Sequence, residues 1–263
     1  MLLSEALAPL LGDPARSAIL LDIDGTLAPI VEHASEASVP EGTRQLLIAI
    51  SRRYGLVACV SGRRASEARA MVAIGSITYL GSHGAELLRG GWTEAELDPG
   101  LREWSRRIAA FTAAVDDPAL RRRRVRIEDK GAITGFHWRG APDEAAARES
   151  VEAIAERAEA EGLVTHWGRK VLEVRPPVQI DKGAGIAKLL AGVEIATALY
   201  AGDDVTDLDA FRMLRALVDE GKLERAVLVG VASDDGPPEI TAEADVVVDG
   251  TGGVRSLLDA LAA

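Results

Sequence analysis

Short apolar runs of strand length, each ending abruptly in polar or glycine residues, constrain the fold of this chain most strongly. Residues 18–21 and 56–60 show no alternation of apolar and polar positions, and residues 77–80 and 197–200 come close to this pattern. Strands of this kind are buried on both faces, as in parallel sheets covered by helices. Segments with helical spacing of apolar residues separate the runs. The pattern therefore predicts an α/β fold with a doubly wound parallel sheet.

The middle of the chain carries a different pattern, which predicts a second domain inserted into the first. Its predicted order is helix, strand, strand, helix, strand, strand, over residues 101–115, 123–128, 133–138, 143–161, 163–167 and 171–174. Such an order forms a self-contained α+β unit rather than a continuation of a parallel sheet. We expect one domain from residues 1–100 and 176–263, and an inserted domain from residues 101–175.

The composition argues against several classes of protein. Lys and Arg number 30 and Asp and Glu number 41, and the net charge of −11 argues against binding along a nucleic-acid backbone. A hydrophobic fraction of 48% is too high for a disordered chain, and the single Cys59 cannot form an intrachain disulfide. No apolar run approaches the roughly 18–20 residues that span a bilayer, and the first residues lack the basic segment of a signal peptide. We expect a cytoplasmic protein without nucleic-acid or membrane partners.

Two aspartates stand where the first apolar run ends. Asp22 and Asp24 are followed by Gly25, which lets the backbone turn and approach a ligand closely. Carboxylates two residues apart at such an exit can both face the crevice at the carboxyl end of a parallel sheet. One could serve as a nucleophile and the other as a proton donor, provided that their environments separate their pKa values. Because Asp and Gly are also common in ordinary turns, the motif alone leaves both interpretations open.

Residues suited to binding phosphate occur at two further places. Ser61 and Gly62, after the second run, offer a hydroxyl and a backbone amide near the start of a helix. Lys182 opens another predicted helix, where a cation opposes the helix dipole unless an anion lies nearby. The alternatives are an ordinary helix cap at Ser61 and a solvated surface lysine at Lys182.

Three aspartates follow the run at residues 197–200. Asp203, Asp204 and Asp207 repel one another, so that their proximity favours a bound cation. Oxygen-only ligands, without cysteine or a spaced histidine pair, indicate Mg²⁺ rather than Zn²⁺. The alternative is a solvated acidic loop, which the apolar strand before it makes less favourable.

These four motifs, in this order, resemble those of the haloacid-dehalogenase-like (HAD) phosphatase superfamily. The resemblance implies a Rossmannoid core with an inserted cap domain of the larger, C2 type. It also implies that Asp22 is the nucleophile that forms an aspartyl-phosphate, and that Asp24 protonates the leaving alkoxide and then activates water. The remaining roles that it implies are Mg²⁺ binding by Asp22, the backbone carbonyl of Asp24 and Asp203, phosphoryl binding by Ser61, Gly62 and Lys182, and support of the metal site by Asp204 and Asp207.

A narrower resemblance, to the trehalose-6-phosphate phosphatases, covers nearly the whole chain. The matching segments are residues 22–30, 81–86, 127–131, 137–139 and 202–207. Leu208 departs from that family's fourth motif, which usually continues Asp-Glu-Asp, but this position lies beyond the metal ligand. In that family the cap grips the sugar, and the matching positions are Glu128, Lys130, Arg139, Glu173 and Arg169. Charged side chains can hydrogen-bond several hydroxyls of a disaccharide, although exposed charges on a strand edge are the alternative.

The resemblance leads to one main hypothesis and two alternatives. The main hypothesis is Mg²⁺-dependent hydrolysis of trehalose 6-phosphate to trehalose and phosphate, a step of trehalose biosynthesis. The alternatives are the same chemistry on another sugar or pseudo-disaccharide phosphate, such as sucrose phosphate, and an inactive regulatory module that binds a sugar phosphate. We expect a small sugar phosphate as the partner, a monomer with a dimer as the alternative, and a solvated face at the basic run of residues 121–124.

Overall fold

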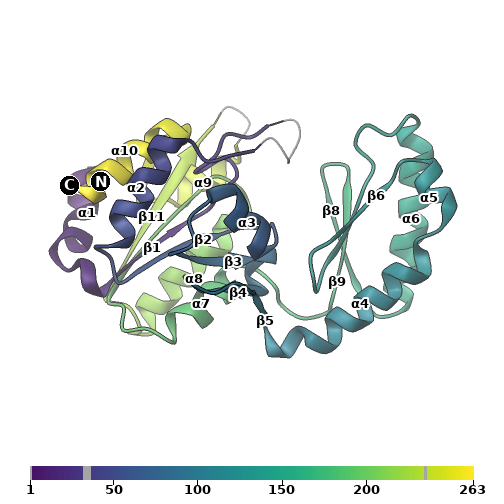
Figure 1. Cartoon of the computed structure of the whole chain (residues 1–263), viewed down its shortest axis with the longest axis horizontal. Coiled ribbons are helices and arrows are strands. Elements are labelled where there is room, and N and C mark those ends of the chain that lie inside the picture. Colours follow the sequence, from purple (N-terminus) through teal and green to yellow (C-terminus); the bar gives the residue numbers. More distant parts are fainter. Residues whose placement is uncertain (1, 32–36, 234–235) are drawn as a thin grey trace. The chain divides into compact units, whose positions relative to one another are not determined.

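The computed structural model describes residues 2–31, 37–233 and 236–263. The chain forms two compact units (Figure 1). The core unit comprises Met1–Glu96 and Ile180–Ala263, and the cap unit comprises Leu97–Gln179. The boundaries expected near residues 101 and 175 both lie inside the cap unit.

An eight-stranded sheet forms the centre of the core unit, in the order β12-β11-β10-β1-β2-β3-β4-β5. The strands are β1 (Ser17–Leu21), β2 (Leu56–Val60), β3 (Thr78–Gly81), β4 (Glu86–Leu88), β5 (Glu96–Leu97), β10 (Thr197–Gly202), β11 (Arg225–Ala232) and β12 (Val246–Asp249). From β12 to β3 every pairing is parallel, which confirms the predicted fold class. β4, which pairs antiparallel with β3, has no counterpart among the strands predicted from the sequence.

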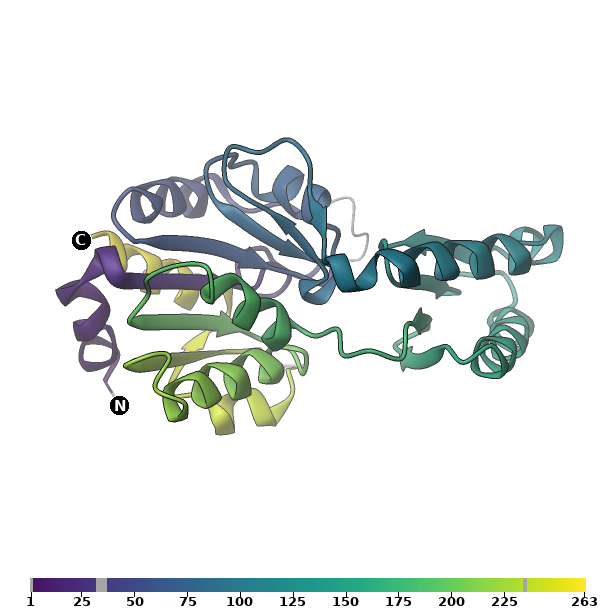
Figure 2. The same ribbon diagram turned by 90° about the horizontal axis from the view of Figure 1, so that it is seen from below.

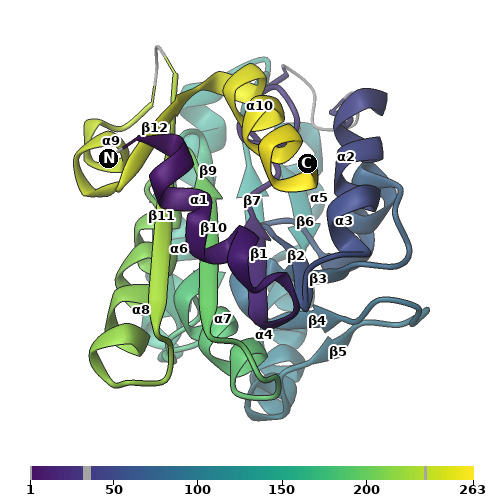
Figure 3. The same ribbon diagram turned by 90° about the vertical axis from the view of Figure 1, so that its left-hand side faces the viewer.

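Helices cover both faces of this sheet. One face packs against α1 (Leu3–Gly12), α2 (Glu41–Ser51), α3 (Ala65–Val72) and α10 (Gly250–Ala262), and the other against α7 (Lys182–Leu190), α8 (Asp207–Asp219) and α9 (Pro238–Glu243). Figure 3 shows α10 beside α2, which it contacts closely. Within β1, Ile19 and Leu21 face the first group of helices, and Ala18 and Leu20 face the second. A strand buried on both sides has no polar face, which explains the apolar runs.

The cap unit has a four-stranded antiparallel sheet with helices on one side (Figures 1 and 2). Its strands are β6 (Arg126–Asp129), β7 (Thr134–His137), β8 (Val164–Gly168) and β9 (Val171–Arg175), in the order β6-β7-β9-β8, and its helices are α4 (Arg102–Val115), α5 (Pro118–Arg122) and α6 (Glu144–Ala160). Phe136 and Leu172 pack against the helices as part of the cap core. Among the described residues of the whole chain, no helix has both the length and the apolar composition needed to cross a bilayer.

The predicted start of the first cap strand is wrong, because the basic run of residues 121–124 lies in and just after a short helix. A strand from residue 123 was expected, but Asp117 caps the short helix α5 by accepting hydrogen bonds from the Ala119 and Leu120 amides. Arg121 forms an ion pair with Asp116 at 2.6 Å. The strand therefore begins only at Arg126, because the preceding residues complete a capped helical turn.

Candidate active site

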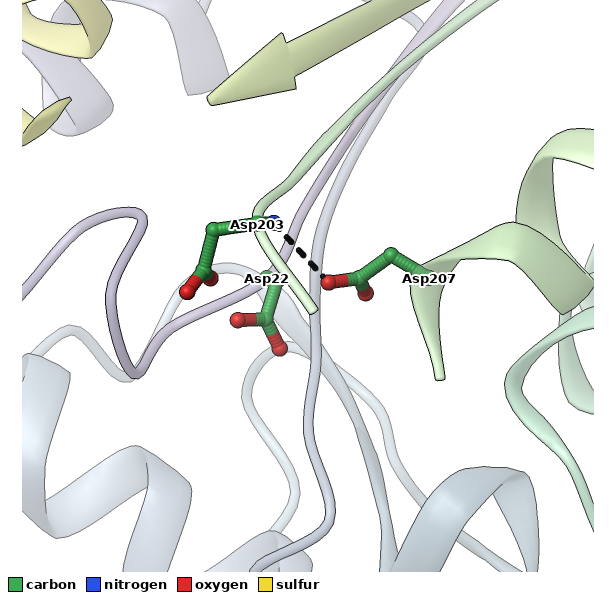
Figure 4. Close-up of side chains that lie close together, drawn as sticks. All are labelled: Asp22, Asp203 and Asp207. Atoms are coloured by element: carbon green, nitrogen blue, oxygen red, sulfur yellow. Dashed lines mark hydrogen bonds between the residues drawn. The ribbon is translucent and has the colours of Figure 1, made fainter. Parts of the chain in front are cut away.

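Three carboxylates meet at the carboxyl ends of β1 and β10. The parallel register places Leu21 opposite Ala201, so that Asp22 and Asp203 leave the sheet side by side. Asp207 comes from the first turn of α8, and each of the three residues has a carboxylate oxygen within 4.8 Å of those of the others. All three are at most 5% exposed, and Figure 4 shows them converging. The structure therefore brings the carboxylates of Asp22, Asp203 and Asp207 together at one edge of the sheet.

A buried lysine links two of these carboxylates. Lys182 Nζ lies 2.6 Å from Asp22 Oδ1 and 2.6 Å from Asp207 Oδ1, and the residue is 3% exposed. Burial opposes the charge of the ammonium, but the two aspartates outweigh it and raise the pKa of Lys182 above its usual value. The surface-lysine interpretation is wrong, because Lys182 opens α7 beneath the carboxylates and its charge is compensated there.

The site has more negative than positive charge among its own groups. If all three carboxylates are ionised, the single ammonium leaves an excess of two negative charges. Burial raises the pKa of Asp22 well above its usual value, with Lys182 offsetting part of the effect. Burial, with repulsion from Asp207 next, raises the pKa of Asp203 to about 6. A buried cluster of oxygen donors with this imbalance fits a divalent oxygen-preferring cation such as Mg²⁺.

Asp207 organises the loop rather than offering free oxygens. Its Oδ1 accepts hydrogen bonds from Lys182 Nζ and from the Tyr200 hydroxyl at 2.6 Å. Its Oδ2 accepts from the backbone amides of Asp203 and Asp204, and Figure 4 shows the first of these bonds. A carboxylate has about four acceptor positions, and four donors occupy these. The Asp204 carboxylate itself is exposed and accepts from the Val205 amide.

The tight turn after β1 explains the glycine in the first motif. Gly25 has a φ of +86°, and a Cβ at this position would lie 2.0 Å from Asp203 Oδ2. Thr26 Oγ1 donates to Asp203 Oδ1 at 3.0 Å. Gly25 thus leaves room for the Asp203 carboxylate, and the Thr26 hydroxyl orients that carboxylate by a hydrogen bond.

The loop after β2 contacts the first motif through Arg63, a residue with no role predicted from the sequence. Arg63 Nε and Nη2 donate to the two Asp24 carboxylate oxygens at 2.7 and 2.6 Å. The Arg63 amide donates to Ser61 Oγ at 3.1 Å. A Cβ on Gly62 would lie 2.8 Å from the His83 ring, so a larger residue here would require the His83 side chain to shift. The structure therefore joins the loops that carry Asp24 and Ser61.

The cap residues form two groups within the cap unit. Lys130 Nζ lies 2.9 Å from Glu173 Oε1 and 4.0 Å from Glu128 Oε2. Arg139 and Arg169 lie together instead at the β8–β9 turn, where Arg139 Nη2 donates to the Arg169 carbonyl at 3.2 Å. Both of these arginines are exposed.

Among the described residues, several side chains that contact the candidate residues were not assigned from sequence, besides Thr26. Arg63 holds Asp24, Tyr200 contacts Asp207, His137 contacts Glu128 and Arg175 contacts Glu173. His137 lies in the quoted segment of residues 137–139, so its position offered a signal, whereas Arg63 follows Ser61 and Gly62 with no sequence pattern that links it to Asp24. Tyr200 lies within an apolar run, and nothing in the sequence indicates its contact with Asp207.

Comparisons with known proteins place the similarity of this chain mainly in one family, the trehalose-phosphatases. The family model for trehalose-phosphatase matches residues 20–239. A probable trehalose-phosphate phosphatase of rice is 32% identical over 76% of this chain and 60% of its own length. A trehalose-phosphate phosphatase of Mycobacterium avium is 30% identical over 83% of this chain and 56% of its own. An uncharacterized glycosyl hydrolase of Mycobacterium tuberculosis is 30% identical over 76% of this chain and 15% of its own.

Two solved structures share the fold over nearly the whole chain. A trehalose-6-phosphate phosphatase related protein is 25% identical with a TM-score of 0.68, over 93% of this chain and 96% of that one. The C-terminal domain of trehalose-6-phosphate phosphatase from C. albicans is 20% identical with a TM-score of 0.75, over 100% of this chain and 97% of that one. This chain spans between 15% and 60% of the length of the curated relatives given above. Since the family model matches well over half of its residues, the chain belongs to the trehalose-phosphatase family.

Proposed function

We propose that this protein is a Mg²⁺-dependent phosphatase that hydrolyses trehalose 6-phosphate to trehalose and phosphate. The observation that carries the proposal is the buried cluster of Asp22, Asp203 and Asp207, in which Lys182 forms ion pairs with Asp22 and Asp207. Membership of the trehalose-phosphatase family supports the substrate class. The cluster suits phosphoryl transfer, which depends on positioning and on neutralising charge.

Asp22 is the proposed nucleophile. Its carboxylate oxygen attacks phosphorus, the bond from phosphorus to the sugar oxygen breaks, and Asp24 delivers a proton to that leaving oxygen. Water then attacks phosphorus of the aspartyl-phosphate, Asp24 takes its proton, and Asp22 is restored as a carboxylate. Arg63 pairs with the Asp24 carboxylate in this structure, so this ion pair must open for Asp24 to donate a proton.

Charge neutralisation makes the first step feasible, because an anionic nucleophile meets an anionic phosphate. Lys182 contributes one positive charge directly beside Asp22. Ser61 and Gly62 are proposed to donate hydrogen bonds to the phosphoryl oxygens. When bound by Asp22, the carbonyl of Asp24 and Asp203, Mg²⁺ would supply the larger share of the positive charge. Asp204 and Asp207 are proposed to support this site without binding the metal.

The sugar is proposed to bind the cap unit. Glu128, Lys130 and Glu173 form one polar cluster there, and Arg139 and Arg169 form a second. Carboxylates accept from sugar hydroxyls and cations donate to them, so the clusters suit a polyhydroxylated leaving group.

A panel of phosphate esters tests the proposal. We expect release of phosphate from trehalose 6-phosphate in Mg²⁺, faster than from sucrose 6-phosphate or glucose 6-phosphate, and loss of this activity in EDTA. Phosphate is measured colorimetrically at matched substrate concentrations. A preference for another disaccharide phosphate would replace the proposed substrate. Binding of trehalose 6-phosphate by calorimetry without any turnover would instead indicate the inactive regulatory module.

A further inference from the structure

Two acidic side chains project from the face of the cap sheet opposite the helices. Glu128 of β6 pairs with Gly135 of β7, and Gly135 pairs in turn with Glu173 of β9, so the three form one row across the sheet. The alternate positions Phe136 and Leu172 are buried against the cap helices. Because successive side chains of a strand point to opposite faces, the two carboxylates lie on the other face.

A histidine holds one of these carboxylates. His137 Nε2 lies 2.5 Å from Glu128 Oε2. His137 follows Gly135 by two residues on β7 and therefore shares its face of the sheet. A Cβ on Gly135 would lie 3.0 Å from His137 Nε2 and 3.7 Å from Glu128 Oε2. The absence of a side chain at Gly135 thus leaves room for the His137 imidazole to contact the Glu128 carboxylate.

The contact keeps Glu128 ionised and oriented. The hydrogen bond from His137 is the main cause that lowers the pKa of Glu128 to about 2, with burial opposing it and Lys130 adding to it. An ionised carboxylate only accepts hydrogen bonds, so His137 Nε2 must donate. His137 and Lys130 both approach Oε2. Within the described contacts, Oε1 remains for another donor.

We propose that His137 is a positioning residue for sugar recognition, which holds the Glu128 carboxylate so that it can accept a hydroxyl of the substrate. The inference rests on the proposed function, in which Glu128 binds the sugar. A glutamate on a strand loses rotamer freedom when it engages a ligand, and a hydrogen bond made beforehand removes part of that cost. His137 itself need not touch the sugar.

Replacing the histidine separates this role from catalysis. For His137→Leu we expect kcat/KM on trehalose 6-phosphate to fall about tenfold, mostly through a higher KM, because a hydrogen bond to a charged group is lost. On p-nitrophenyl phosphate, which has no sugar hydroxyls, we expect kcat/KM within about twofold of the wild type. Steady-state kinetics on both esters in Mg²⁺ give the comparison.

Two further variants show whether His137 acts through Glu128. His137→Gln keeps an N–H donor and is expected to recover most of the lost kcat/KM. His137→Leu added to Glu128→Gln is expected to cost little beyond Glu128→Gln alone, since residues that act as a unit are not additive. Thermal unfolding of each variant verifies that the cap remains folded.

The outcomes distinguish the inference from the proposed function. An equal loss on both esters, independent effects of the two substitutions, or unchanged kinetics of His137→Leu on the sugar phosphate would each overturn the positioning role. If the wild type hydrolyses p-nitrophenyl phosphate but no sugar phosphate, the proposed function fails and the inference fails with it. If the wild type hydrolyses trehalose 6-phosphate and only the variant pattern is absent, the inference alone fails.

Discussion

Asp22→Asn is expected to reduce phosphate release by on the order of 10⁴-fold or more, while leaving the fold intact. The amide oxygen can still accept the hydrogen bond that Asp22 Oδ1 receives from Lys182 Nζ. The amide is a poor nucleophile, so the first chemical step is lost. Single-turnover assays with trehalose 6-phosphate in Mg²⁺ measure the effect.

The same variant has an expected stability signature. Because the folded-state pKa of Asp22 is raised, ionising Asp22 lowers the stability of the folded state progressively as pH rises from its ordinary value of 3.8 through the raised value. An asparagine does not titrate, so in EDTA at pH 8 Asp22→Asn should unfold at a denaturant concentration no lower than the wild type. Asp259→Asn, an exposed position on α10, serves as the control and should change neither activity nor stability. Retention of more than about a tenth of wild-type turnover by Asp22→Asn would contradict the assigned role.

Lys182→Met is expected to have the largest effect on stability. It removes the ammonium that contacts Asp22 and Asp207 and leaves three buried carboxylates without a cation from the protein. Breaking a buried ion pair from one side typically costs about 3–5 kcal/mol, because the remaining charge is uncompensated. Urea denaturation in EDTA measures the free energy of unfolding, and phosphate release should be lost as well.

A matched substitution on the same helix separates this effect from a change of helix composition. Lys188 is exposed in the last turn of α7, where a cation favours the helix dipole, and Lys188→Met should lower the free energy of unfolding by no more than about 1 kcal/mol. Addition of Mg²⁺ should recover part of the stability of Lys182→Met, since a ligand that binds the folded state stabilises it. Equal stability of Lys182→Met and the wild type in EDTA would contradict the proposed charge balance.

The parallel core could be predicted because its physical cause is local. A strand such as β1 is buried on both faces. Ile19 packs against the helices on one face and Ala18 against those on the other, so the strand is a continuous run of apolar residues in the sequence. The three-residue strand β4 has no such pattern, and its pairing with β3 depends on where the intervening turn places it. The helix α5, which Asp117 caps, was not predicted because its five residues are too few to show a helical spacing of apolar positions.

Some residues of the candidate site could likewise be predicted from local sequence, and their partners could not. Asp22 and Asp203 follow apolar strands and Lys182 opens a helix, so the sequence marks all three by their position at the ends of predicted elements. Their partners depend on register between strands and on side-chain reach, as with Arg63 and Asp24, which are 39 positions apart. Such pairings follow from the folded geometry and have no local pattern.

Trapping the covalent intermediate tests the central claim most directly. Enzyme mixed with stoichiometric trehalose 6-phosphate and Mg²⁺, quenched in acid within one turnover and reduced with borohydride, should carry homoserine at residue 22, identified by peptide mass spectrometry. Asp22→Asn treated in the same way should show no modification there. Steady turnover of the wild type with residue 22 unmodified at every quench time, or with the modification at another carboxylate, would contradict the account.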